Sequence, residues 1–214
     1  MAHRFALYYA PEPGSTLDRL ASDWLGRPEL AGETVSARRY GFHATIKAPM
    51  ALKRGESADG LSLALSAFCK AQGRVPVGRI EPRIIDGFLA LAPVAQLQEL
   101  TEFAGVVVQQ FDRFRAPLDP RERERRLNAP LSDRQIALLD RYGYPYVFEQ
   151  FQFHMTLTDR LLPARQSLLI EDARRHFAPA LAEPLWLDRL VVFLEPASGV
   201  AFVRGEDFVF KGMS

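Results

Sequence analysis

The stretches YGFHATIKAPM (residues 40–50) and FQFHMTLTDR (residues 151–160) share one short pattern: Phe, His, any residue, Thr, then an apolar residue. Two of the four histidines in the chain, His43 and His154, lie in these stretches. With this composition one such pattern arises by chance with odds of roughly one in a hundred, and two arise far more rarely. The repeated pattern therefore indicates a duplicated unit whose histidines have a function.

The elements around the two patterns also repeat. Each half of the chain predicts a strand, a helix, the Phe-His strand, a second helix and two more strands. From His43 to Val75, which opens the next expected strand, is 32 residues, and from His154 to Pro184 is 30. The lengths after each histidine therefore agree, as a duplication requires.

The two repeats, at about 1–92 and 88–214, are expected to form one α+β domain over residues 1–214. The strand that begins each repeat precedes its histidine by 38 residues in the first half and by 66 in the second. This difference predicts a helical hairpin at about 117–145, inserted into the second repeat.

Apolar periodicity and turn residues place the individual elements. The expected strands are residues 4–10, 42–48, 75–81, 87–93, 151–158, 185–195 and 200–210. The expected helices are residues 15–26, 57–72, 94–115, 132–141 and 164–177, with a polar loop at 27–39. Ser15 or Thr16, Ser57 and Ser132 are the expected N-caps.

Alternation along a strand decides which side chains share a face. In the second pattern the polar face is expected to carry Gln152, His154, Thr156 and Thr158. In the first pattern it is expected to carry His43, Thr45 and Lys47. Two related lobes that face each other would bring both polar faces into one cleft.

Two imidazoles in one cleft are suited to paired proton transfer near neutral pH. One neutral ring takes a proton from water or a hydroxyl group, and the other, protonated, gives a proton to a leaving oxygen. The hydroxyls of Thr45 and Thr156 are expected to bind non-bridging phosphate oxygens, and Lys47 to supply a positive charge. The sequence thus predicts a metal-free site for displacement at a phosphodiester, with His43 and His154 as catalytic residues.

Composition excludes several other classes of function. Lys plus Arg is 27 and Asp plus Glu is 26, so a protein that coats long nucleic acid is not expected. One cysteine and four scattered histidines offer no metal-binding pattern, and no cofactor is expected. Cys69 lies in an apolar helical run and is expected to be buried, and a single cysteine suits a cytoplasmic protein. No signal peptide or membrane span is expected.

The paired H-x-T motifs resemble those of the two-histidine phosphoesterase superfamily, which includes RNA cyclic phosphodiesterases and 2′-5′ RNA ligases. The strings RFALYYAPEPGS, RRYGFHATIKAPM and FQFHMTLTDRL are most similar to the bacterial branch associated with phosphonate-utilisation operons. The resemblance covers essentially the whole chain. It implies a bilobal fold of two antiparallel sheets with helices outside and a central cleft, and it implies hydrolysis of a small cyclic phosphate such as a cyclic ribose phosphate or nucleotide.

Further residues are candidates for substrate binding. Arg38, Arg39 and Tyr40 precede the first motif, and Tyr8 shares a strand face with Arg4. Tyr144 belongs to an aromatic run before the second motif, and such rings can sandwich a base. The charged run at 119–130 is interpreted as a solvated helix face, with a phosphate-binding role as the alternative.

Two alternatives stay open at this point. A phosphate-ligand binding protein without turnover would keep the same cleft. An RNA end-processing or 2′-5′ ligase activity would use the same histidines, although long RNA would require a more basic surface. The sequence does not determine the oligomeric state.

Overall fold

Nine strands and seven α-helices form the described part of the chain, residues 3–211 of a computed structural model. The strands are β1 (Arg4–Tyr9), β2 (Ala44–Ala51), β3 (Val75–Gly78), β4 (Ile80–Ile85), β5 (Phe88–Pro93), β6 (Met155–Arg160), β7 (Leu185–Leu187), β8 (Arg189–Glu195) and β9 (Val203–Val209). The helices are α1 (Thr16–Gly26), α2 (Val35–Tyr40), α3 (Ala58–Lys70), α4 (Gln98–Phe111), α5 (Pro120–Leu127), α6 (Asp133–Tyr142) and α7 (Pro163–Leu181). The predicted α+β class is therefore confirmed.

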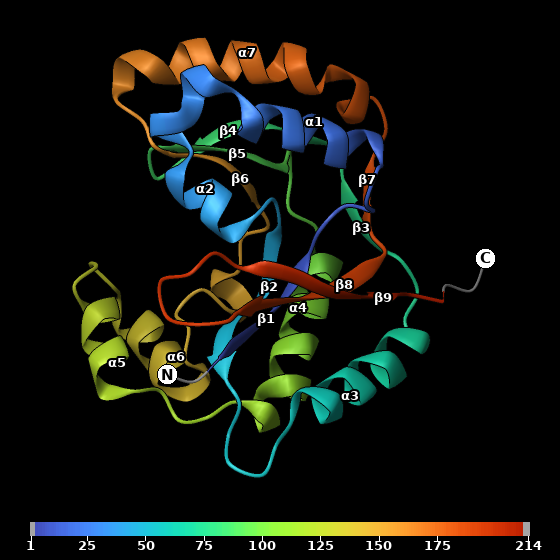
Figure 1. Cartoon of the computed structure of the whole chain (residues 1–214), viewed down its shortest axis with the longest axis vertical. Coiled ribbons are helices and arrows are strands. Elements are labelled where there is room, and N and C mark those ends of the chain that lie inside the picture. The colour runs from blue at the N-terminus through green and yellow to red at the C-terminus, as the bar shows by residue number, and fades with distance from the viewer. Residues whose placement is uncertain (1–2, 212–214) are drawn as a thin grey trace.

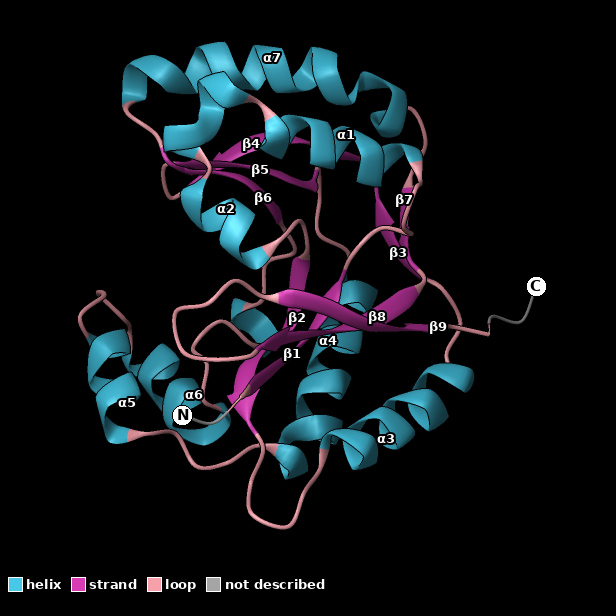
Figure 2. Ribbon diagram, in the orientation of Figure 1, coloured by secondary structure: helices cyan, strands magenta, loops and turns pink. Residues whose placement is uncertain are grey.

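A seven-stranded sheet in the order β4-β5-β6-β2-β1-β8-β9 forms the centre of the fold, and each of its neighbouring pairs is antiparallel. Its two parts meet at β2 and β6, which share the single paired position Ala44–Met155. Helices α1 and α7 cover the part formed by β4, β5 and β6, whereas α3 and α4 cover the other part (Figure 1; Figure 2). Each part of the sheet, together with the helices that cover it, thus forms one of two lobes.

Each lobe contains strands from both repeats. Strands β8 and β9, from the end of the chain, extend the lobe that β1 and β2 begin, and β4 lies beside β5 in the other lobe. The short strands β3 and β7 pair with each other as a separate two-stranded sheet between the lobes (Figure 1). The chain therefore crosses between the lobes more than once. The lobes are also joined directly, through the pairing of β2 with β6.

Side-chain caps begin three of the helices where the sequence predicts them. Ser15 accepts a hydrogen bond from the Asp18 amide, and Ser57 accepts one from the Gly60 amide. Ser132 begins α6 with a reciprocal capping box. A cap of this kind stabilises a helix by about 1 kcal/mol.

The hydrophobic core joins elements from both repeats. Trp24 of α1 is fully buried against Phe177 of α7, and its indole Nε1–H donates to the Leu157 carbonyl of β6 at 3.1 Å. Phe153, the aromatic residue of the second motif, is also fully buried. Cys69 is 1% exposed, as expected, and burial raises the pKa of its thiol to about 12.

Several boundaries differ from the sequence prediction. The expected loop at 27–39 contains a 3-10 helix, Pro28–Glu33, followed by α2, whose Ala37 is buried. The expected strand at 42–48 ends too early, because β2 continues through Pro49 to Ala51. Pro49 falls in an irregularity of the β1–β2 ladder, where a missing N–H removes no regular hydrogen bond.

Two strands that the sequence predicts as continuous are each divided. Residues 75–81 separate into β3 and β4 at Arg79, directly after Gly78, whose φ of 84° is readily adopted only by glycine. Residues 185–195 separate into β7 and β8 at Asp188. Helices α5 and α6 lie within the segment, 117–145, for which an inserted hairpin is expected.

Thr158 does not lie on the cleft face with His154, as alternation predicts. The β5–β6 register shifts between Phe88 and Ala90, and the fully buried Thr158 hydroxyl accepts a hydrogen bond from the Leu89 amide at 2.9 Å. The Thr158 hydroxyl thus provides a hydrogen-bond acceptor for the Leu89 amide where the β5–β6 ladder is irregular.

We expect Thr158→Val to lower the free energy of unfolding by about 1–3 kcal/mol, because valine cannot accept the buried Leu89 N–H. The measurement is urea denaturation followed by circular dichroism. Thr16→Val, at an exposed position, is the matched control and should change the stability by less than about 0.5 kcal/mol. Equal stability of the two variants would contradict this role of the hydroxyl group.

Candidate active site

The two H-x-T motifs line one cleft of about 390 Å³ between the lobes. His43, Thr45, His154 and Thr156 all contribute to its wall. Each histidine immediately precedes its strand, β2 or β6, and the residues that follow them, Ala44 and Met155, are the pair that joins the lobes. The strand pairing therefore brings together two residues that are 111 positions apart in sequence.

The two imidazole rings are held in the same way. His43 Nδ1–H donates to the Gly41 carbonyl at 2.8 Å, and His154 Nδ1–H donates to the Gln152 carbonyl at 2.9 Å. In each case the acceptor lies two residues before the histidine. This arrangement places the proton of the neutral ring on Nδ1 and leaves Nε2 for chemistry.

Gly41 is required by the backbone that presents His43. It ends α2 with φ 73° and ψ 167°, a conformation that is essentially restricted to glycine. A Cβ atom there would lie 3.2 Å from Cε1 of Phe193. The glycine thus allows the chain to turn from α2 into β2 with its carbonyl directed at the histidine ring.

The surroundings of the two histidines differ at one equivalent position. Tyr8 is the β1 partner of Thr45, and Ala90 is the β5 partner of Thr156. The Tyr8 ring stacks on His43 with centroids 3.7 Å apart and an interplanar angle of 16°. His154 instead has a tilted contact with Phe88, at 5.5 Å. The duplicated site is therefore asymmetric.

This asymmetry affects proton affinity. Burial lowers the pKa of His43 to about 4, against the Gly41 hydrogen bond that raises it, and repulsion from His154 lowers it further. Burial also lowers the pKa of His154, opposed by its hydrogen bond to Gln152 and by the charge of Asp86. The Thr45 hydroxyl lies 3.3 Å from His43 Nε2, which can accept its hydrogen bond.

Three of the predicted substrate-binding residues line the cleft: Tyr8, Tyr40 and Tyr144. Three others are not among the cleft-lining residues. Arg38 donates to the Arg27 carbonyl, and Arg39 forms an ion pair with Glu195 at 2.8 Å. The Gln152 side chain is exposed to solvent, and only its carbonyl contributes, by orienting His154.

Lys47 does not reach the cleft, contrary to the alternation pattern. The β1–β2 register shifts between the Leu7–Lys47 and Tyr8–Thr45 pairs, so Ala48 follows Thr45 on the cleft wall. Lys47 is 3% exposed, and its ammonium group bonds Asp112 at 3.1 Å and the Val108 carbonyl at 3.2 Å. The expectation that Lys47 supplies charge to the cleft is therefore wrong.

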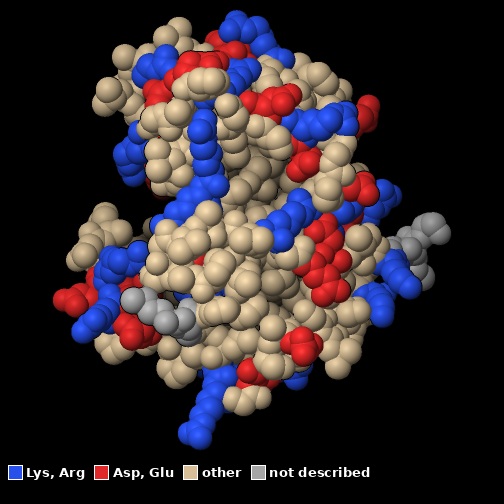
Figure 3. All heavy atoms as spheres, in the orientation of Figure 1, with Lys and Arg blue, Asp and Glu red and all other residues tan. Residues whose placement is uncertain are grey.

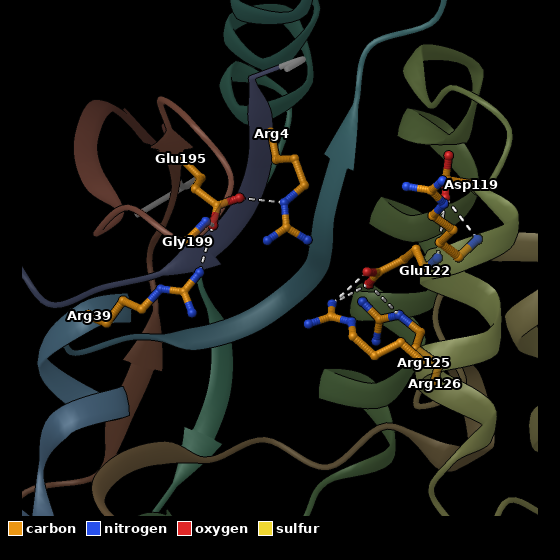
Figure 4. Close-up of polar contacts among 9 residues, drawn as sticks. Arg4, Arg39, Asp119, Glu122, Arg125, Arg126, Glu195 and Gly199 are labelled. Carbon is orange, nitrogen blue, oxygen red and sulfur yellow. Dashed lines mark hydrogen bonds and ion pairs between the residues drawn. The ribbon is translucent and has the colours of Figure 1, made fainter.

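Arg4, which shares the Tyr8 face of β1 as expected, lines the same cleft, and so do Arg125 and Arg126 from α5, which were not predicted as site residues (Figure 4). The interpretation of residues 119–130 as a wholly solvated helix face is therefore wrong for two positions. The sequence contains one indication of a role for Arg125 and Arg126, which is that they lie in the expected insertion. Only the tertiary structure shows that their side chains line the cleft.

Within residues 3–211, no three His, Cys, Asp or Glu side chains gather closely enough to hold a metal ion. None of the helices in this part of the chain combines the length and the apolar run needed to cross a bilayer. Lys and Arg are interspersed with Asp and Glu over the face shown in Figure 3. That face therefore has no extended basic track of the kind that long nucleic acid requires.

Comparison with known proteins identifies one family. A family model described as "Protein of unknown function (DUF1045)" matches residues 45–203. Ribose 1,5-bisphosphate phosphokinase PhnN of Janthinobacterium sp. (strain Marseille) is 39% identical over 231 residues, an alignment that covers 98% of this chain and 51% of the relative. The chain spans about half the length of the curated relatives it matches.

Solved structures resemble the chain over its whole length. The protein TT0787 of Thermus thermophilus is 11% identical with a TM-score of 0.50, covering 99% of this chain and 100% of that chain. E. coli LigT, solved in complex with 3′-AMP, is 12% identical with a TM-score of 0.49, covering 99% of each chain. At such identities the likeness concerns the fold alone.

We expect Lys47→Met to leave the affinity of the cleft for inorganic phosphate unchanged within about twofold, because the ammonium group lies outside it. The unfolding free energy should fall by about 1–2 kcal/mol, a limited loss because Asp112 keeps its ion pair with Arg115. Calorimetric titration with phosphate and denaturant unfolding measure the two quantities. Phosphate binding weakened more than about fivefold would show that Lys47 acts in the cleft after all.

Proposed function

Because the chain belongs to the DUF1045 family and carries paired H-x-T motifs, we propose that it is a phosphoesterase that hydrolyses a small cyclic phosphodiester. His43 and His154 are the proposed acid–base pair, and Thr45 and Thr156 the proposed phosphate-binding residues. The reaction needs no metal ion in this proposal.

One observation carries the proposal: both histidines line one cleft, and the same main-chain contact leaves Nε2 of each ring available. A single phosphate between the two rings would meet a proton acceptor on one side and a proton donor on the other. In-line displacement at phosphorus requires this arrangement, because the entering and leaving oxygens lie on opposite sides.

The proposed step balances with water as the only co-reactant. Nε2 of one histidine takes a proton from water as its oxygen forms a bond to phosphorus. The ring P–O bond breaks, and the leaving ribose oxygen takes a proton from Nε2 of the other histidine. The products are a phosphate monoester and a free hydroxyl group, and proton exchange with solvent restores both rings. The hydroxyls of Thr45 and Thr156 donate hydrogen bonds to the non-bridging oxygens.

His43 is the proposed base and His154 the proposed acid. The base must be unprotonated, which the stacked and buried His43, with a pKa of about 4, satisfies over the ordinary pH range. The acid must hold a proton: burial lowers the pKa of His154, and its hydrogen bond to the Gln152 carbonyl and the charge of Asp86 oppose that lowering. The presence of Ala90 at the position equivalent to Tyr8 thus gives two related motifs different roles.

A small ribose phosphate is the proposed substrate class. A cavity of about 390 Å³ suits a small molecule, and Tyr40 and Tyr144 give its wall aromatic surface for a sugar or base. The matched relatives are named for ribose 1,5-bisphosphate, which supports a phosphorylated ribose here, in phosphonate metabolism as the sequence resemblance implies.

The phosphokinase activity in that name is not proposed for this chain. The chain covers only half of the relative, and its sequence contains no G-x-x-x-x-G-K-[ST] phosphate-binding loop. The proposal therefore transfers the chemical class of the substrate and not the reaction.

The proposal is tested by a screen of cyclic phosphates: ribose 1,2-cyclic phosphates, nucleoside 2′,3′-cyclic phosphates, and the latter at the end of a long RNA. We expect turnover of at least one small compound that His43→Ala and His154→Ala abolish. Saturable binding of those compounds without turnover would favour a binding protein, and turnover only of the RNA would favour RNA end-processing. Either result would overturn the proposal.

The pH dependence of kcat/KM should be a bell on the acid side of neutrality. The rate should rise as pH passes about 4, where His43 loses its proton, and fall as pH passes the lowered pKa of His154, below 6.5. His43→Ala should remove the acidic limb and His154→Ala the basic limb, each with a loss of roughly 10²–10⁴ in rate. The double variant should lose little more than the worse single variant.

The control for this profile is Thr45→Ala or Thr156→Ala. Each should lower kcat/KM by an amount that corresponds to a loss of about 1–3 kcal/mol of transition-state stabilisation, and both limbs of the pH profile should stay in place. A single histidine variant that keeps both limbs and near-wild-type turnover would contradict the acid–base pairing.

Metal removal gives an independent check. We expect EDTA treatment followed by desalting to leave kcat unchanged. The Thr hydroxyls and the two imidazole rings stabilise the charge on the phosphoryl group, which is the role that a metal cation would otherwise have. Loss of activity that one divalent ion restores would refute the metal-free step.

A further inference from the structure

The cleft holds more positive charge than a cyclic phosphodiester needs. Arg4 from β1 and Arg125 and Arg126 from α5 all line it, whereas no Asp or Glu among the described residues does. A cyclic phosphodiester carries one negative charge, and the H-x-T motifs already provide two rings and two hydroxyls for it. The arginines are therefore unexplained by the reaction alone.

The carboxylates nearest these arginines compensate only half of their charge. Glu195 is 1% exposed and is shared by Arg4 and Arg39. Glu122 is shared by Arg125 and Arg126, at 2.5 and 3.0 Å. Each group thus has two guanidinium ions for one carboxylate and keeps one positive charge.

The carboxylates also leave donors of the arginines available to the cleft. Glu195 bonds Nε of Arg4, and no partner in the described structure bonds the terminal nitrogens of Arg4. Glu122 likewise bonds Nε of Arg126, whose guanidinium lies 5.2 Å over the Tyr144 ring. Arg4 and Arg126 are therefore held in place from behind, as a preformed anion site requires. Arg125 instead bonds Glu122 through its terminal Nη2, and its side chain is 66% exposed.

This site lies apart from the histidines along the same strand face. Arg4 and Tyr8 are four residues apart on β1, about 13 Å between their Cα atoms at the usual rise of a strand, and Tyr8 stacks on His43. The arginine and histidine side chains nevertheless line one cavity of about 390 Å³, so one small molecule with phosphate at both ends would contact both groups. Arginine forks match the oxygens of a terminal phosphate group, which carries close to two negative charges.

We propose that Arg4, Arg125 and Arg126 form a second anion subsite, which binds a terminal phosphate monoester on the same ribose whose cyclic phosphate lies between His43 and His154. The inference rests on the proposed function and specifies its substrate as a doubly phosphorylated ribose. The inserted hairpin then has a role of its own, because α5 adds substrate specificity to a duplicated fold that otherwise supplies only the chemistry.

The test compares two substrates that differ in one group, methyl riboside 2,3-cyclic phosphate with and without a 5-phosphate. The wild type should favour the 5-phosphorylated compound by about tenfold to a hundredfold in kcat/KM, from added hydrogen bonds to a charged group. Arg125→Gln/Arg126→Gln should remove this preference while changing kcat/KM for the other compound less than about threefold. Arg4→Gln should reduce the preference in the same direction.

Arg121→Gln is the matched control, because it removes the same charge from the same helix at an exposed position outside the cleft. It should keep the full preference, and thermal melts should show that every variant is folded. Equal kcat/KM of the two compounds in the wild type would overturn the subsite. So would a loss of the preference in Arg121→Gln as large as the loss in the double variant. Stronger activity on an oligoribonucleotide with a terminal cyclic phosphate would overturn it too, because the arginines would then follow an RNA backbone.

A binding measurement separates this inference from the proposed function. If neither compound is hydrolysed, the proposed function fails, and calorimetry with methyl riboside 2-phosphate and its 2,5-bisphosphate still tests the subsite. The bisphosphate should bind about tenfold more tightly to the wild type and to Arg121→Gln, but not to the double variant. Equal affinities for the two compounds would reject the subsite on its own.

Discussion

The pairing of Ala44 with Met155 is the interaction on which the site depends. It is the one paired position between β2 and β6, and it joins the two parts of the sheet. Because each histidine immediately precedes one member of this pair, the rings from both repeats meet at the same point of the sheet. The chain also crosses between the lobes elsewhere, since β8 lies beside β1 and β4 lies beside β5.

The two H-x-T motifs hold their histidines in the same way, but the residues around the two rings make them unequal. The ring of Tyr8 covers His43, whereas the equivalent position in the second repeat is the small Ala90. A covered imidazole is harder to protonate than an open one, because burial disfavours the charged form. Helix α5 adds a second difference, since it brings Arg125 and Arg126 to the wall of the cleft.

The sequence was sufficient for the features that depend on local patterns. The sequence predicted the two motifs, the α+β order and the N-caps Ser15, Ser57 and Ser132. These features depend on residues that are close together in the sequence. The tyrosines Tyr8, Tyr40 and Tyr144 also lie on the cleft, as the sequence suggested.

Features that depend on strand register were not predictable in the same way. Lys47 and Thr158 fall on the expected face only if alternation is unbroken, and shifts in the β1–β2 and β5–β6 ladders turn both away from the cleft. The direction of Arg125 and Arg126 depends on how α5 docks, which a charge pattern does not specify. Helix α2 was missed because it is six residues long, too short for periodicity to indicate it.

The central claim is that His43 and His154 act on one phosphoryl group from opposite sides. A crystal structure with a ribonucleoside–vanadate complex tests it most directly, because five-coordinate vanadium reproduces the geometry of in-line displacement. The account predicts one apical oxygen within hydrogen-bond distance of Nε2 of His43, the other within that distance of Nε2 of His154, and equatorial oxygens bound by Thr45 and Thr156. Vanadate held by only one histidine, or bound outside this cleft, would contradict it.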